Sequence, residues 1–339
     1  MTERPRRTAL ENLAIPAMVA LGAIIAVQTK VNGQLAQELG SGMRAGVLAA
    51  VVSFGSGLLI LTAITVPSPQ LRVGARSVYA AVRTGRLKPW QVVGGMAGAM
   101  LVASQGLTVP TIGVALFTVA VVAGQTSSGL AVDHAGLGPS GPRAVSQGRV
   151  LGAAVTLLAV GVAVSGRLEG SNALTLAALA LAALPLIAGG FASWQQAVNG
   201  QVAAVGGPFA AALNNFAVGT ATLLVVLAAS FLAPGHLTTP PTQWWLYSGG
   251  ALGCVVIASA AVLVRVHGVL VLGLSIVAGQ LVTSVALDAL GGTHLGPSTV
   301  IGAAIALVGV TIGAWSSNRG GRRPQREAGA ARTRGGRRP

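Results

Sequence analysis

Two pairs of carboxamide side chains are the residues best suited to binding a polar molecule. Gln28 and Asn32 lie four positions apart in an apolar stretch, and Gln195 and Asn199 repeat that spacing. Residues at this spacing share one face of a helix, so each pair presents donors and acceptors together. The pairs could line a pathway for polar ligands or join helices by hydrogen bonds inside a membrane. We expect a substrate pathway and keep the structural alternative equally open.

A second set of polar residues also recurs along the chain. Gln125 is followed by Ser128, and Gln280 by Thr283, with the same three-residue spacing. Each pair shares a helix face. We therefore expect Gln125 and Gln280 to contribute to the same pathway, although helix packing would also explain them.

Asp133 and Asp288 occupy equivalent positions at the ends of two apolar stretches. Ionisable groups at membrane depth are costly and usually functional, which suggests gating or proton coupling. The plainer alternative is that each aspartate ends its helix among the lipid headgroups. An aspartate at a helix C-terminus opposes the helix dipole, so the alternative does not fully explain them.

The sequence shows no pattern that indicates an enzyme. It has no pair of carboxylates within one apolar stretch, no Ser/His/Asp constellation and no phosphate-binding loop. Cys254 is the only cysteine, and the four histidines lack the spacing of metal ligands. We therefore expect no catalytic activity, no bound metal and no cofactor.

The polar motifs belong to an internal repeat. The segment 31–34 (VNGQ) returns at 198–201, and the segment 122–125 (VAGQ) returns at 277–280. Trp90 returns as Trp245, and each tryptophan is followed by two glycines four positions apart. Glycine lets membrane helices approach closely. We therefore expect these glycines to pack helices together: Gly94, Gly98, Gly249 and Gly253.

Composition identifies the repeat as a unit of membrane helices. Of the 339 residues, 53% are hydrophobic and only 9% are charged, whereas a soluble domain carries about 25% charged residues. Stretches of roughly 20 apolar residues can cross the hydrocarbon core as helices. We predict an all-α membrane protein with ten spans, near 12–34, 45–66, 90–108, 111–132, 149–166, 173–197, 209–233, 244–264, 268–288 and 298–316.

Charge placement predicts how these spans are oriented. With the N-terminus in the cytoplasm, all of the 22 Lys and Arg except Lys30, Arg44 and Arg167 fall on the cytoplasmic side. Both termini are then cytoplasmic. Five spans in each copy make the copies inverted repeats, an arrangement that transporters use for alternating access. The predicted divisions are a basic N-terminus (1–11), two five-helix repeats (12–166 and 173–316) and a disordered tail (317–339).

The arginine-rich tail has two interpretations. It resembles disordered segments that bind RNA, but its position after the last span favours attraction to anionic lipid headgroups. We expect the second and do not expect nucleic acid as a partner. Formation of a homodimer remains open. Between the second and third spans, the basic segment 68–89 is predicted to form an amphipathic segment at the surface.

The motifs resemble a known family. Two inverted sets of five spans resemble the drug/metabolite transporter superfamily. Gln28, Asn32 and Gly33 with Ser53-Phe54 and Gly57, and their second copy with Asn215-Phe216 and Gly219, are similar to the YdcZ-like group of inner-membrane exporters. So is the stretch from Gly124-Gln125 to Asp133. The resemblance covers about residues 13 to 316 and implies an exporter in a bacterial-type inner membrane.

The sequence therefore predicts a transporter that exports a small molecule by alternating access. Small multidrug exporters of the superfamily use a glutamate within the first span, and this chain has only Glu11 and Glu38 near the ends of that span. Two alternatives remain open: a flippase for a lipid-linked substrate, and a non-transporting scaffold that recruits partners through its basic tail. The substrate, coupling ion and direction do not follow from the sequence.

Overall fold

A computed structural model describes residues 9–139, 141–142, 144–165, 172–291 and 295–320. The predicted tail beyond residue 320, most of the predicted N-terminal segment, and Arg143 and Arg167 lie outside these residues. So do the side chains of residues 264–271, including Arg265.

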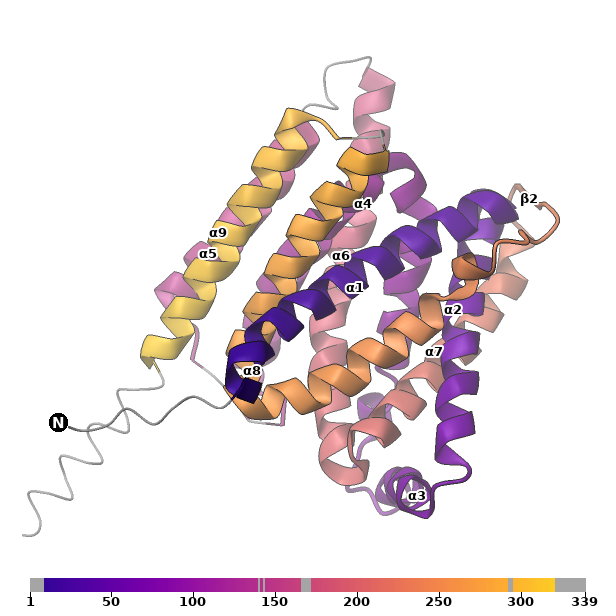
Figure 1. Cartoon of the computed structure of the whole chain (residues 1–339), viewed down its shortest axis with the longest axis vertical. Coiled ribbons are helices and arrows are strands. Elements are labelled where there is room, and N and C mark those ends of the chain that lie inside the picture. The colour runs from indigo at the N-terminus through magenta and orange to yellow at the C-terminus, as the bar shows by residue number, and fades with distance from the viewer. Residues whose placement is uncertain (1–8, 140, 143, 166–171, 292–294, 321–339) are drawn as a thin grey trace, which may run out of the picture.

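Long helices account for nearly all of the described chain (Figure 1). Two short strands and two 3-10 turns, η1 and η2, lie in the connections. The elements are α1 (Ala9–Leu39), β1 (Gly40–Ser41), α2 (Gly42–Thr65), α3 (Pro69–Arg83), η1 (Pro89–Gln91), α4 (Gly95–His134), α5 (Gln147–Ser165), α6 (Asn172–Gly206), α7 (Pro208–Ser230), β2 (Gly235–Leu237), η2 (Trp244–Tyr247), α8 (Gly249–Gly291) and α9 (Pro297–Gly320).

The third and fourth predicted spans are two helical arms that meet at a break within the element α4. Pro110 does not end α4, contrary to the expected division there; the break falls at Gly113, which has φ 78° and ψ 169°. Only glycine adopts such a conformation readily. The eighth and ninth predicted spans likewise belong to the single element α8, which Figure 1 shows as two arms meeting at a bend.

Seven helical segments in the described part of the chain are long and apolar enough to cross a membrane. The segment from Pro89 to His134 has 46 residues, about twice the length that one crossing needs. The fold is thus predominantly helical with several spans, as expected. The division into ten spans stays a prediction.

The helices pack in four principal pairs: α1 with α8, α4 with α6, α2 with α7, and α5 with α9. Glycine makes two of these approaches so close that backbones touch. A Cβ atom on Gly279 of α8 would lie within 3.0 Å of the Val19 carbonyl in α1, and one on Gly124 of α4 within 3.0 Å of the Leu186 carbonyl in α6. Gly279 and Gly124 are repeat equivalents, so the sequence repeat is also a repeat of contacts.

Phe54 of α2 and Phe216 of α7 form the centre of one apolar core, with ring centroids 5.0 Å apart. Both side chains are buried. Gly57 lies against the Phe216 ring, and Gly219 against the Phe54 ring. The glycine that follows each phenylalanine by one helical turn therefore makes room for the ring of the opposite helix.

At one end of the bundle, a small strand pair ties the two halves of the chain together. β1 and β2 are antiparallel, with Ser41 opposite His236. Arg44 reinforces this connection by donating hydrogen bonds to the carbonyls of Ala233 and Gly235, at 3.2 and 3.0 Å, and by stacking over the Phe231 ring.

Two glycine substitutions test the close helix contacts. Gly95 faces the α7 backbone at Asn215 and Gly219, and Gly250 faces the α2 backbone at Ser53 and Gly57. Gly95→Ala and Gly250→Ala should each lower the free energy of unfolding by about 1–3 kcal/mol, because backbone cannot move aside for a methyl group.

The measurement is unfolding of the purified protein in mixed detergent. Gly55→Ala is the control, since nothing lies within 4 Å of a Cβ at Gly55. An equal loss of stability in the control would contradict this account of the contacts.

Candidate functional site

The first carboxamide pair lies in a hydrogen-bonded cluster between α1, α4 and α8. The Asn32 side-chain nitrogen donates to Gln105 Oε1 at 2.7 Å, and Gln105 Nε2 donates to Thr29 Oγ1 at 3.2 Å. Asn32, Gln105 and Thr29 are each less than 5% exposed. Gln28 Nε2 donates to the Gly249 carbonyl at 2.7 Å. Gln105, a direct partner of Asn32, was not among the residues predicted for the pathway.

The second carboxamide pair shares a single acceptor. Gln195 Nε2 and Asn199 Nδ2 donate to Asn215 Oδ1 at 2.8 and 3.0 Å. Asn215 is buried on α7. It was not among the expected pathway residues, although its place in the repeat, where Asn215-Phe216 matches Ser53-Phe54, was a signal for it.

Each carboxamide pair lies against the glycine pair of the opposite repeat. A Cβ atom on Gly249 would come within 3.0 Å of Asn32 Oδ1, and one on Gly253 would lie 2.9 Å from Gln28 Nε2. The residues predicted for the pathway and those predicted for helix packing are therefore partners in one contact.

The same contact occurs a second time with the halves exchanged. A Cβ atom on Gly94 would lie 2.9 Å from Asn199 Oδ1, and one on Gly98 would lie 2.5 Å from Gln195 Nε2. We call these two arrangements the carboxamide–glycine contacts: Gln28 and Asn32 on Gly249 and Gly253, and Gln195 and Asn199 on Gly94 and Gly98.

Both contacts leave one amide oxygen without a conventional hydrogen bond. Asn32 Oδ1 and Asn199 Oδ1 are buried, and neither accepts a hydrogen bond from another described residue. Each oxygen faces a glycine Cα, whose C–H group is only a weak donor. A buried acceptor with so weak a partner is available to a stronger donor, such as an N–H or O–H group of a ligand.

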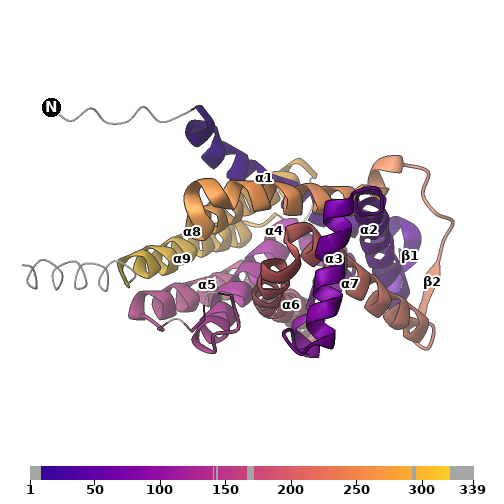
Figure 2. The same cartoon turned by 90° about the horizontal axis from the view of Figure 1, so that it is seen from below.

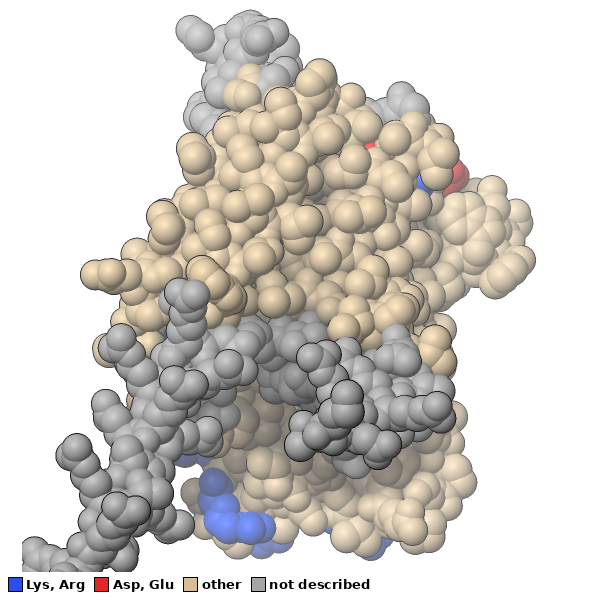
Figure 3. Space-filling view, turned by 60° about the vertical axis from the view of Figure 1, so that its left-hand side comes forward, with Lys and Arg blue, Asp and Glu red and all other residues tan. Residues whose placement is uncertain are grey.

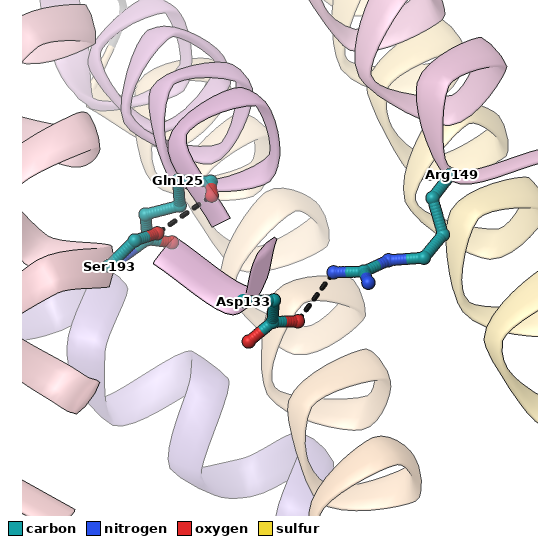
Figure 4. A network of polar contacts seen from close by, with 4 residues as sticks. All are labelled: Gln125, Asp133, Arg149 and Ser193. Atoms are coloured by element: carbon teal, nitrogen blue, oxygen red, sulfur yellow. Dashed lines mark hydrogen bonds and ion pairs between the residues drawn. The ribbon is translucent and has the colours of Figure 1, made fainter. Parts of the chain in front are cut away.

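Gln125 and Gln280 lie apart from these contacts. Gln125 accepts a hydrogen bond from Ser193 Oγ at 2.7 Å through its backbone oxygen (Figure 4), and it lines a cavity of about 190 Å³ with Thr126 and Arg149. Gln280 is buried on α8, and its backbone nitrogen lies against Gly22 of α1. Gln125 therefore faces open space, whereas Gln280 is enclosed between two helices.

Asp288 caps the second arm of α4. Its two carboxylate oxygens accept hydrogen bonds from the backbone N–H groups of Val114 and Ala115, at 3.0 and 2.8 Å. These residues follow the break at Gly113, so their N–H groups begin a new helical arm and have no partner within it. A carboxylate there also complements the helix dipole. Asp288 is 5% exposed, so it does more than end its own helix at the headgroups.

Asp133 has a different environment. It forms an ion pair with Arg149 at the start of α5 (Figure 4), and its side chain is 34% exposed. Repeat-equivalent aspartates therefore have unlike partners: backbone amides for Asp288 and a guanidinium for Asp133. The structure brings neither aspartate into hydrogen-bonding contact with the four carboxamides within the described residues.

The two aspartates provide matched variants. Asp288→Asn should lower the free energy of unfolding by about 1.5–3 kcal/mol, because the neutral amide turns an N–H group toward backbone N–H donors and loses a charge-assisted bond. Asp133→Asn should cost less than about 1 kcal/mol, since its ion pair is partly exposed to solvent. Unfolding of both variants in the same detergent checks the difference. Equal losses would contradict the capping role.

Comparison with known proteins places these features in a family. The model of the family described as "Putative inner membrane exporter, YdcZ" matches residues 13–163 and 180–315, which together make up most of the chain. Both carboxamide–glycine contacts and both aspartates lie within the matched regions. A search of curated proteins finds no match. The apolar helices and this match identify a multi-pass inner-membrane protein and favour a transporter over an enzyme. The chain belongs to the YdcZ family of inner-membrane exporters.

Proposed function

We propose that this protein exports a small molecule across the inner membrane by rocking two inverted five-span repeats against each other. The observation that carries this proposal is the pair of carboxamide–glycine contacts, in which each half supplies the carboxamides for one contact and the glycines for the other. A two-fold relation between the halves would produce such an exchange, and alternating-access transporters place their sites at interfaces of this kind.

Charge placement supports the inversion. The basic segment after α2 carries Arg72, Arg76, Arg83, Arg86 and Lys88, whereas its equivalent after α7, from Phe231 to Gln243, has no lysine or arginine. The positive-inside rule then puts these equivalent connections on opposite sides of the membrane. Both termini would be cytoplasmic.

The pathway would be lined by Gln28 and Asn32 from one repeat and Gln195 and Asn199 from the other, with Gln125 and Gln280 contributing at a distance from these contacts. In the present conformation, the first four lie on glycines of the opposite repeat. When the repeats separate, Asn32 Oδ1 and Asn199 Oδ1 would lose only weak C–H contacts and could accept a hydrogen bond from the cargo. Neutral carboxamides suit a polar ligand without selecting for its charge.

Asp133 and Asp288 would be the gate residues. Asp288 holds the break in α4, and Lys30 lies beside it, donating to the Leu287 carbonyl at 3.2 Å. Asp133 holds α4 to α5 through Arg149. If the transporter is closed at one face of the membrane and open at the other, its equivalent gate residues are expected to have different partners. Protonation of either carboxylate would weaken its contact, which would couple the gate to protons.

A lipid-linked substrate is the second candidate. An apolar cavity of about 430 Å³ lies between α4 and α6, lined by Ser128, Ile187, Gly190, Phe191 and Trp194. Ile187 and Phe191 are each about half exposed, so this cavity could admit an acyl chain from the bilayer. Arg44 does not support this candidate as an anchor for a headgroup, because backbone carbonyls that follow α7 already bind its guanidinium.

A reversible crosslink tests transport even though the cargo is unidentified. Ser41 and His236 are opposite residues of the β1–β2 pair, and opposite Cα atoms in an antiparallel pair lie within disulfide range. In a Cys254→Ala background, Ser41→Cys/His236→Cys should form a disulfide that holds this end closed. Export should then stop and should return after reduction.

The measurement is untargeted mass spectrometry of the medium around expressing cells, before and after reduction. Each single-cysteine variant is a control that cannot crosslink internally. Solutes that appear only after reduction of the double variant identify the cargo. If the crosslinked and reduced proteins release the same solutes, alternating access at this end is wrong.

A further inference from the structure

The surface helix α3 carries a row of arginines on one face. Arg72, Arg76 and Arg83 fall at spacings of about one and two helical turns, with Tyr79 between them. All four side chains are exposed, Tyr79 to 67%. The guanidinium of Arg83 lies over the Tyr79 ring, 5.9 Å from its centroid. These four residues form what we call the α3 basic face.

The opposite face of α3 packs on the bundle. Val78 and Ala81 are buried against α6 and α7, and Gly74 lies so close to the Gly206 carbonyl that a Cβ atom would come within 3.0 Å of it. Since α3 is fixed by this face, the basic face is held outward. It therefore cannot turn inward to find partners within the protein.

No carboxylate among the described residues forms an ion pair with the arginines of the basic face. The sequence has no Asp or Glu between Glu38 and Asp133. Arg72 donates to the Val66 carbonyl at 2.8 Å, which leaves its positive charge in place. The ion pair found among described residues joins Arg149 to Asp133. An anionic partner must come from outside the described protein.

The position of α3 indicates what that partner is. α3 lies across the ends of α6 and α7 rather than beside them (Figures 1 and 2), and Lys and Arg gather at this end of the molecule on the face shown in Figure 3. The ends of membrane spans lie at the level of the phospholipid headgroups. Arginine side chains reach such headgroups while their stems stay on apolar surface, and tyrosine is enriched at the same depth.

We propose that the α3 basic face binds anionic phospholipid headgroups of the leaflet on its side of the membrane. Arg72, Arg76 and Arg83 would contact the phosphates, with Tyr79 at the interface. Each arginine near such a surface should raise the preference for anionic over neutral lipid about fivefold. This site is independent of transport: it needs only the membrane-spanning helices and the position of α3.

The experiment reads lipid contact locally at α3. A bimane label is placed at the exposed Ala80 position (Ala80→Cys in a Cys254→Ala background), and the full chain is reconstituted with brominated phosphatidylglycerol or brominated phosphatidylcholine in otherwise neutral vesicles. Phosphatidylglycerol should quench the label more strongly. In an Arg72→Gln/Arg76→Gln/Arg83→Gln variant this preference should be lost.

Two controls make the result specific, and a competition with RNA tests the alternative partner. The corresponding lysine triple variant keeps the charge and should keep the preference. A label at Thr239, beyond β2, should show none.

Equal quenching by both lipids at position 80, or a preference that survives in the glutamine variant, would overturn the proposal. Displacement of brominated phosphatidylglycerol from position 80 by an equal phosphate concentration of single-stranded RNA would overturn it in favour of a nucleic-acid site.

Discussion

The structure depends on how carboxamide groups are buried in a membrane. An amide without partners is costly in hydrocarbon, so the side-chain nitrogens of Gln28, Asn32, Gln195 and Asn199 each donate to an acceptor on a neighbouring helix. Glycine makes this possible because it brings the opposite backbone within reach: Gly249 offers its carbonyl to Gln28 and its Cα to Asn32. A larger residue at Gly249 or Gly94 would push the amide away from these partners. This requirement adds to the close approaches at Gly279 and Gly124 in packing α1 on α8 and α4 on α6.

The same principle explains the break in α4. A helix interrupted at Gly113 exposes backbone N–H groups, which cannot remain unpaired inside a membrane. Asp288 supplies both acceptors from a helix far away in the sequence. The break and the aspartate therefore depend on each other, and a change in one alters the other. This mutual dependence makes Asp288 a natural point of control for the helix arms, while Asp133 holds its helix by a more exposed ion pair that is easier to release.

Much of this architecture could be predicted from the sequence, since apolar length, glycine spacing and the internal repeat reveal the helices and mark the residues that matter. The amphipathic segment before Pro89 was also predictable, and it is α3. What the sequence could not reveal is which marked residues meet. Gln28 and Gly249 are far apart in the chain, and each motif taken alone fits either packing or binding. The position of the break was missed because Pro110 is the stronger local signal, whereas the aspartate that caps the arm after Gly113 lies far away in the sequence. Asn215 was overlooked because its role appears only when Gln195 and Asn199 converge on it.

The central claim is that the two halves are inverted, so that equivalent connections face opposite sides of the membrane. The most direct test compares Thr84, after α3, with Thr239, after β2, which lie in the connections that follow α2 and α7. Both side chains are exposed. Each is replaced by cysteine in a Cys254→Ala background and treated in intact cells with a maleimide that cannot cross the inner membrane. The account predicts labelling at position 239 alone, and labelling of both after the membrane is permeabilised. Labelling of both positions, or of neither, in intact cells would contradict it.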